Sequence, residues 1–197
     1  MGMNLKKIIS HVKKYMRGRM CDEQDNIYQM AEAALIHGNH LEIGTLHGGS
    51  AIVVAMAKRE YGLSGRVVCV DPLNGYYAGT KYYRETDPIS GVPINADVVL
   101  ENAARFGVEL EVLQMSSEHA FSVLKVPRFA STYIDGNHWG NAPLFDFVEA
   151  SKITDEVIIF DNYEKKHPDV VSACHAAARE WIKQEPQKGI TFIVRKP

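Results

Sequence analysis

The stretch His40–Ser50, which reads His-Leu-Glu-Ile-Gly-Thr-Leu-His-Gly-Gly-Ser, predicts the fold more clearly than any other part of the chain. Its apolar residues Leu41 and Ile43 indicate a short strand, its glycines a tight turn, and the alanine-rich segment after it a helix. Such a turn leaves backbone N–H groups pointing into open space, and glycines let a ligand approach that backbone closely. The stretch therefore predicts a binding site, although an ordinary turn between a strand and a helix has the same composition.

Length and composition narrow the class of protein. With 197 residues, 46% hydrophobic and 23% charged, the chain is predicted to form one domain, 1–197, with residues 1–38 as a helical N-terminal cap. The net charge of -2 gives no electrostatic reason to expect a nucleic-acid partner. The basic residues between Lys6 and Arg19 are interpreted as a solvated helix face, with a phosphate or membrane contact as the alternative.

The cysteines and the apolar segments indicate the cellular compartment in which the protein is expected. Cys21, Cys69 and Cys174 are widely spaced and form no CxxC pair, so neither a disulfide framework nor a thiolate zinc site is expected. No segment approaches the ~20 apolar residues that a membrane span needs. We therefore expect a cytoplasmic protein that makes no membrane contact.

Strand and helix patterns alternate along the chain. The expected strands are 41–43, 67–70, 110–113, 130–134, 157–160 and 190–194; the expected helices are 5–16, 25–37, 51–59, 95–106, 116–124, 141–152 and 168–183. This alternation is typical of a parallel sheet covered on both faces. We predict an α/β fold with a doubly wound, mostly parallel sheet, two leading helices and a long loop at 72–93.

Ligands of such sheets bind at the carboxyl ends of the strands. Asp71 follows the second strand, a position from which a carboxylate accepts hydrogen bonds from ribose hydroxyls, so the site is predicted to take a nucleoside. A dinucleotide is disfavoured because the turn has Leu46 where a GxGxxG turn needs glycine. Glu42 would also repel a phosphate. The alternative for Asp71 is a strand-end residue that starts a turn.

At this point the sequence resembles the class I S-adenosylmethionine-dependent methyltransferases, which have a Rossmann-like sheet, and most of all the small O-methyltransferases of sugars, macrolides and catechols. The matching segments are 41–45 with 48–50, 70–73, 134–138 and 159–163. The resemblance implies S-adenosylmethionine as cofactor. The residues that it assigns to the cofactor are Glu42, Gly44, Thr45, Gly48, Gly49 and Ser50 at the methionine part, Asp71 at the ribose, Ser117 and Glu118 at the adenine, and also Asp135.

Asp135, Asp161 and Asn162 follow the fourth and fifth expected strands. If these strands are neighbours, their ends lie about 5 Å apart, and two carboxylates and an amide oxygen converge. Such an oxygen-rich set suits Mg²⁺. It resembles the metal site of the catechol-type enzymes, although the same residues could simply start turns.

His138 lies three residues after Asp135, and its ordinary pKa of ~6.5 suits a general base at neutral pH. The resemblance assigns catalysis to His138 with Asp135; the alternative is a histidine that only caps a helix. Trp139 could line the cofactor pocket or belong to the core, and His47 could face ligand or solvent. Four tyrosines of the long loop are expected to contact the acceptor, to fold on their own surface or to form a dimer contact: Tyr76, Tyr77, Tyr82 and Tyr83.

The sequence thus predicts an O-methyltransferase that uses S-adenosylmethionine and a divalent cation, most simply Mg²⁺, on a small hydroxylated acceptor. A nicotinamide-dependent oxidoreductase and a catalytically silent relative that binds a cofactor or a partner are the alternatives. Two departures from the family pattern stand out: residues 151–156 replace a Lys-Pro-Gly-Gly turn, and a single last strand is expected instead of an antiparallel pair. That shortened C-terminal edge leaves room for pairing between subunits in a homo-oligomer.

Overall fold

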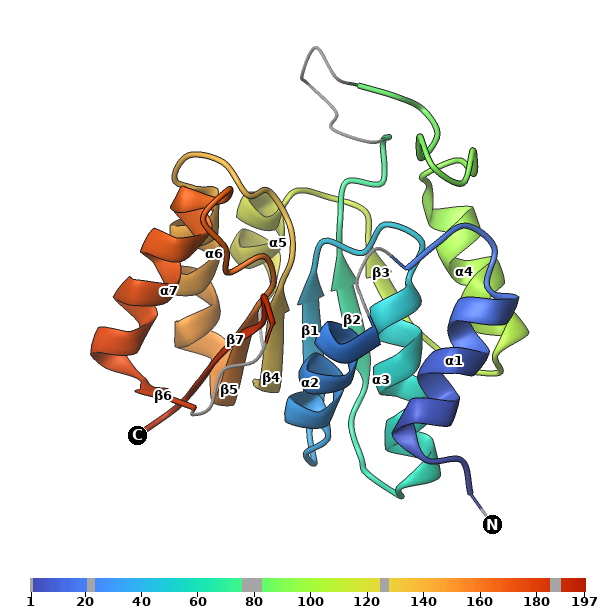
Figure 1. Cartoon of the computed structure of the whole chain (residues 1–197), viewed down its shortest axis with the longest axis horizontal. Helices are drawn as coiled ribbons and strands as arrows, with labels where there is room; N and C mark the ends of the chain where they lie inside the picture. The colour runs from blue at the N-terminus through green and yellow to red at the C-terminus, as the bar shows by residue number, and fades with distance from the viewer. Residues whose placement is uncertain (1, 21–23, 76–82, 125–127, 185–188) are drawn as a thin grey trace.

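The computed structural model describes residues 2–20, 24–75, 83–124, 128–184 and 189–197, and in this part of the chain seven strands form one sheet between two layers of helices (Figure 1). The strands are β1 (Asn39–Ile43), β2 (Val67–Val70), β3 (Glu111–Leu113), β4 (Phe129–Ile134), β5 (Thr154–Phe160), β6 (Ile182–Lys183) and β7 (Phe192–Arg195). Their order is β3-β2-β1-β4-β5-β7-β6. The strands β1 to β5 are parallel, and β7 runs antiparallel to both β5 and β6.

The helices are α1 (Leu5–Tyr15), α2 (Gln24–Ala34), α3 (Gly49–Glu60), α4 (Ala96–Arg105), α5 (Ser117–Val123), α6 (Ala142–Ile153) and α7 (Pro168–Glu180). Helices α1 to α3 cover one face of the sheet and α5 to α7 the other (Figure 1). Each layer encloses its own apolar core because β1, β2 and β4 are buried on both faces. The predicted doubly wound α/β fold is confirmed.

The C-terminal edge differs in detail from the expectation. The helix predicted to reach residue 183 ends at Glu180, because Trp181 turns to an extended backbone and buries its side chain in the core. Residues 182 and 183 then pair with β7 as β6. The antiparallel pair that the sequence did not predict is therefore present as β6 and β7. Because the outer strand β6 is only two residues long, the C-terminal edge of the sheet is short, as expected.

Helix α6 leads into β5 without a loop, since α6 ends at Ile153 and β5 begins at Thr154. The sequence placed the start of β5 three residues later because residues 154–156 are polar. Thr154 is nevertheless buried, and its hydroxyl bonds to that of Thr132 on β4 at 2.7 Å. This junction replaces the Lys-Pro-Gly-Gly turn of the resembling families.

The segment after α1 lies against the glycine turn between β1 and α3. The buried Asn102 side chain accepts a hydrogen bond from Arg17 N at 2.7 Å and donates to the carbonyls of Arg17 and His47, at 2.8 and 3.0 Å. His47 itself is fully buried, so it does not face solvent. Asn102 on α4 thereby ties the N-terminal segment to the turn.

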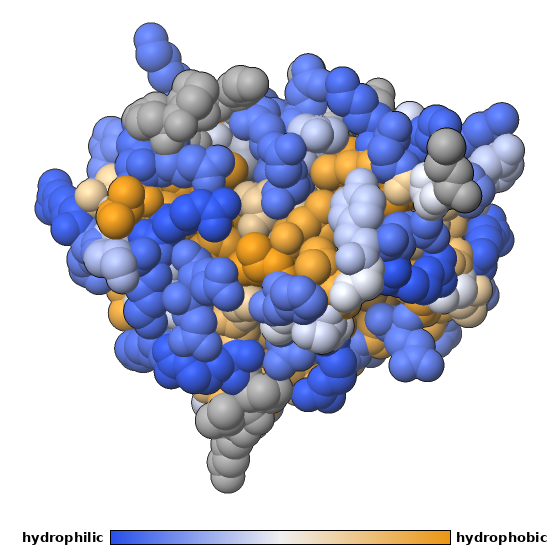
Figure 2. Space-filling model, turned by 90° about the horizontal axis from the view of Figure 1, so that it is seen from below, coloured by the Kyte–Doolittle hydropathy of each residue, from blue (hydrophilic) through white to orange (hydrophobic). Residues whose placement is uncertain are grey.

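The amino ends of the strands form the opposite end of the molecule, where apolar side chains gather near the centre of the face in Figure 2. Here the Lys58 ammonium donates to the carbonyls of Gly38 and Ser64, at 2.8 and 3.3 Å, and burial lowers its pKa. These bonds satisfy the carbonyls where the chain enters β1 and leaves α3. Within the described residues, no helix is long and apolar enough to cross a bilayer.

Gly44 is predicted to be the least replaceable glycine of the turn. Its φ is +89°, and a Cβ there would collide with the backbone carbonyl of Asp135 at the end of β4. Gly44→Ala should lower the free energy of unfolding by at least about 3 kcal/mol, since strain and displacement of β4 add. Gly62→Ala is the matched control: its φ is +67° with open space around the Cβ, so only about 1–2 kcal/mol of strain is expected. Equal losses in urea unfolding would contradict the collision.

Candidate active site

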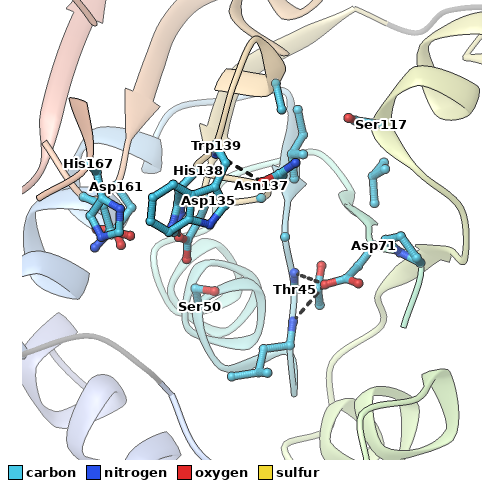
Figure 3. A pocket seen from close by; sticks show the side chains of 18 of the residues that line it. Thr45, Ser50, Asp71, Ser117, Asp135, Asn137, His138, Trp139, Asp161 and His167 are labelled. Atoms are coloured by element: carbon cyan, nitrogen blue, oxygen red, sulfur yellow. Dashed lines mark hydrogen bonds and ion pairs between the residues drawn. The ribbon is translucent and has the colours of Figure 1, made fainter. Parts of the chain in front are cut away.

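A cavity of about 820 Å³ opens at the carboxyl ends of β1, β2, β4 and β5. It lies where the strand order changes direction between β1 and β4, the usual ligand position in such sheets. Its volume is in the range of small-molecule and cofactor sites. Most of the predicted site residues line it: Gly44, Thr45, Gly49, Ser50, Asp71, Ser117, Glu118, Asp135, His138, Asp161 and Asn162. Figure 3 labels Thr45, Ser50, Asp71, Ser117, Asp135, His138 and Asp161 among them.

Glu42 and Gly48 are predicted site residues that lie outside the cavity lining. Glu42 is fully buried behind the turn, where its Oε1 accepts a hydrogen bond from Ser50 Oγ at 2.9 Å. Gly48 faces Val99 of α4 and has a left-handed backbone at the start of α3. The structure thus gives Glu42 a contact with the cavity through Ser50, and direct contact of either residue with a ligand stays a prediction.

The Asp71 carboxylate closes the glycine turn from the end of β2. Its Oδ2 accepts hydrogen bonds from Thr45 N at 2.7 Å and Leu46 N at 3.2 Å, and its Oδ1 accepts one from Leu73 N at 2.8 Å (Figure 3). These bonds stabilise Leu46 at a φ of +50°, without the glycine that a dinucleotide turn has there. A carboxylate offers about four acceptor sites, so about one remains for a ribose hydroxyl.

Asp135 and Asp161 follow two neighbouring strands, β4 and β5, which is the condition under which the sequence predicted that their side chains converge. Ile134 of β4 is in register with Phe160 of β5, and Asp161 N donates to the Ile134 carbonyl at 3.1 Å. Asp161 is only 2% exposed, and Asn162 adopts a φ of +56° directly after it. The two strand ends therefore present both carboxylates at one end of the cavity.

His138 faces the same end, with its Nε2 3.2 Å from Oδ1 of Asp135. If Nε2 carries the proton of that hydrogen bond, Nδ1 is the unprotonated ring nitrogen. His138 is therefore oriented by Asp135, as a general base must be.

Trp139, Lys166 and His167 also line the cavity. The Trp139 side chain is 53% exposed, which contradicts the core interpretation of that residue. Lys166 and His167 come from the loop before α7. The sequence predicted only the end of this loop, because a proline starts the helix that follows it, and it did not predict that the loop reaches the cavity.

Arg19 lines the cavity as well, which corrects its interpretation as part of a solvated face. Its Nε donates to both carboxylate oxygens of the buried Asp87, at 2.9 and 3.0 Å, and Ser90 also donates to Asp87. No local pattern predicts a contact between residues so far apart in sequence. The long loop is thereby tied to the N-terminal segment. Tyr76, Tyr77 and Tyr82 lie outside the described residues, and Tyr83 is not part of the described cavity lining.

The cavity carries an excess of negative charge. Among the described residues, its lining contains five carboxylates and two permanent cations. The carboxylates are those of Asp71, Glu118, Asp135, Asp161 and Glu164, and the cations are Arg19 and Lys166. Such a lining favours a cationic ligand or metal ion over an anionic one.

Asp146 of α6 is a buried carboxyl group behind the cavity. It is hydrogen-bonded to Ser117, and burial, with a smaller contribution from the charge of Glu118, raises its pKa from 3.8 to about 6. The side chain also lies next to Gly136, whose backbone lines the cavity. Asp146 thus connects α6 with the wall at Ser117.

The strand order, the glycine turn and the cavity at the switch point together define a Rossmann-like domain of the class I methyltransferase type. Residues 41–163 match the family model described as a methyltransferase domain, and the chain belongs to that family. This confirms the resemblance that the sequence motifs indicated. No curated protein matches the chain.

Solved structures agree with this fold. The O-methyltransferase NovP is 14% identical with a TM-score of 0.68, over 87% of this chain and 78% of NovP. An O-methyltransferase from Bacillus cereus in complex with SAH is 21% identical with a TM-score of 0.57, over 98% and 90%. The SAH-bound methyltransferase PaMTH1 of Podospora anserina is 12% identical with a TM-score of 0.62, over 100% and 90%. At these identities the likeness establishes the fold.

Asp146 is predicted to make stability fall with rising pH. Its folded-state pKa of about 6 exceeds the usual 3.8, so the native state binds more protons between these values. The free energy of unfolding should therefore decrease by up to about 3 kcal/mol as the pH rises from about 4 to 6. Asp146→Asn should remove this component in urea unfolding curves measured across the range. Asp97→Asn, at an exposed position of α4, is the control; a slope lost equally in both variants would contradict the assignment.

Proposed function

We propose that this protein is an S-adenosylmethionine-dependent O-methyltransferase that acts on a small hydroxylated acceptor. One observation carries the proposal: a single cavity joins the glycine turn and Asp71 at one end to His138, Asp135 and Asp161 at the other. A cofactor held at the first end would direct its reactive group toward a base and two carboxylates at the second. The methyltransferase-domain family supports methyl transfer as the reaction.

The first end suits a nucleoside with a cationic centre. The turn offers backbone and the Ser50 hydroxyl, and Asp71 has acceptor capacity left for a ribose. Ser117 and Glu118 line the same cavity, and we propose that they contact the adenine. The negative lining favours a sulfonium ion and opposes the pyrophosphate of a nicotinamide cofactor. A methyltransferase is therefore favoured over an oxidoreductase.

A divalent cation fits the second end only with help from other oxygen atoms. Within the described residues, no three His, Cys, Asp or Glu side chains are grouped to hold a metal ion. Asp135 and Asp161 would need the Asn162 amide and oxygens of the acceptor or water, a mixed shell that is usual for Mg²⁺. We propose these three residues as its protein ligands.

When bound, S-adenosylmethionine would supply an electrophilic methyl group, and the cation would supply positive charge for the acceptor oxygens. The protein's own residues would supply the base and the alignment of the reactants. Asp135 would orient His138, and His138 Nδ1 would take the proton of the acceptor hydroxyl, which prepares that oxygen for methylation. The fixed strand ends contribute alignment of the two reactants.

Calorimetry tests the cofactor directly. S-Adenosylhomocysteine is expected to bind with measurable heat, whereas NAD is not, because its pyrophosphate would face Asp71 and the other carboxylates. Asp71→Asn should weaken S-adenosylhomocysteine binding, because asparagine keeps one acceptor oxygen and its N–H₂ can accept from neither the turn nor the ribose. Binding of NAD alone would overturn the proposal in favour of the oxidoreductase.

The second end is tested by substitution. His138→Gln should lower kcat by about 10²- to 10⁴-fold while S-adenosylhomocysteine binds normally; His119→Gln, at an exposed position of α5, should change neither. Asp161→Ala should abolish the part of turnover that requires Mg²⁺ and leave cofactor binding intact. Wild-type turnover that is unchanged by a chelator would refute the metal, but not the base.

A further inference from the structure

Arg19 is a cation in the wall of a cavity whose charged lining is mostly acidic. Among the described residues, it shares this role with Lys166, and Lys166 pairs at 2.8 Å with Glu164, which lines the same cavity. Arg19 pairs instead with Asp87, which is fully buried and is not part of the described lining. The ion-pair partner of Arg19 therefore lies behind the cavity wall, and the cation lies in front of it.

A tight contact places Arg19 beside the glycine turn. Its neighbour Met20 packs on Gly49, where an added Cβ would lie 2.9 Å from Met20 Cβ. The backbone N of Arg19 also donates to Nδ1 of the buried His47 at 3.3 Å. Under the proposed function this turn holds the methionine part of the cofactor, so Arg19 belongs to the same end of the cavity.

The Arg19 side chain extends from the turn to the long loop. Its Nε donates to both carboxylate oxygens of Asp87, at 2.9 and 3.0 Å, and 19% of the side chain is exposed. Ser90 fixes that carboxylate, since its N and Oγ donate to Asp87 Oδ2 at 2.7 and 2.8 Å. A guanidinium has five N–H donors arranged as a fork, so it can bind a second carboxylate beside the first.

Ser50, the residue after Gly49, presents the opposite polarity to the cavity. Its Oγ donates to Oε1 of the buried Glu42 at 2.9 Å, and Ser50 itself lines the cavity (Figure 3). Because its one hydroxyl proton is directed at Glu42, Ser50 Oγ faces a ligand as an acceptor. The turn is thus flanked by a cation and by an acceptor backed by a carboxylate, a pattern that suits a zwitterion.

We propose that Arg19 binds the α-carboxylate of the amino-acid part of the cofactor, with Ser50 facing its ammonium group, and that Asp87 is the positioning residue of Arg19. The inference rests on the proposed function, because it adds residues that recognise one end of that cofactor. The carboxylate of S-adenosylmethionine enters a cavity with an excess of negative charge, which opposes it. Arg19 offsets this repulsion at the end where the ligand is anionic.

Calorimetry with S-adenosylhomocysteine and decarboxylated S-adenosylhomocysteine, which keeps the amino group, tests the contact. The wild type should bind S-adenosylhomocysteine more tightly, although the acidic lining alone favours the analogue; the reverse order would overturn the inference. Arg19→Gln should weaken S-adenosylhomocysteine about 10- to 100-fold and the analogue less than about twofold, because only the first ligand loses a charge-assisted pair. Arg19→Lys should restore part of the loss, since it keeps the charge without the fork.

Arg17→Gln is the matched control. Arg17 lies in the same segment, but it forms an exposed ion pair with Glu101 at 2.7 Å and is not part of the described lining. It should change the affinity for neither ligand. An effect equal to that of Arg19→Gln would contradict the assignment to Arg19.

The role of Asp87 needs variants of its own. Asp87→Asn removes a negative charge, which by electrostatics alone favours an anionic ligand. Weaker binding of S-adenosylhomocysteine with unchanged binding of the analogue would therefore identify a positioning role, and stronger binding would refute it. Arg19→Gln leaves Asp87 as a buried unpaired anion, which can destabilise the fold. The double variant Arg19→Gln/Asp87→Asn removes both charges and should show the same loss, for S-adenosylhomocysteine only.

The remaining outcomes separate the inference from the proposed function. If Arg19→Gln and the double variant weaken both ligands equally, Arg19 only holds the cavity wall together and the inference is wrong. If they change the affinity for neither ligand, the inference is wrong and the proposed cofactor stands. If the wild type binds neither ligand, the proposed function itself fails.

Discussion

The hydrogen bonds from the backbone of the glycine turn to the Asp71 carboxylate set the geometry of the whole candidate site. Thr45 N and Leu46 N would otherwise be unpaired donors at the end of β1, and a buried donor without a partner costs about 1–3 kcal/mol. Their pairing with Asp71 fixes the end of β1 relative to that of β2. The same carboxylate then has little capacity left for a ligand, so structure and recognition compete for one side chain.

The other end of the site depends on the register of β4 and β5. Because Ile134 and Phe160 are paired, Asp135 and Asp161 leave the sheet at the same level. Gly44 lets β1 approach this point closely, since Asp135 N donates to the Ile43 carbonyl at 2.8 Å. The two ends of the cavity are therefore parts of one hydrogen-bonded sheet, and their separation cannot vary without breaking strand pairs.

The sequence predicted the sheet and most cavity residues because both follow from local patterns. Apolar strands that end in Gly44, Asp71, Asp135 or Asp161 determine which side chains reach the carboxyl edge. It did not predict the contacts made across long sequence separations. The pairing of Arg19 with Asp87 and the position of His167 beside Trp139 depend on tertiary packing, which leaves no periodic signal. Likewise, the polar start of β5 has a low strand propensity that the Thr132–Thr154 bond overrides.

The direct junction of α6 with β5 has a consequence for how this domain can vary by insertion. Ile153 is the last helical residue and Thr154 the first of the strand, so no loop absorbs a change in length. One residue added there would shift the strand by one position and turn every side chain of β5 to the opposite face, unless the helix took up the extra residue. Asp161 would then leave the cavity edge. We expect length variation among close relatives of this chain to avoid this junction and to collect in its surface loops.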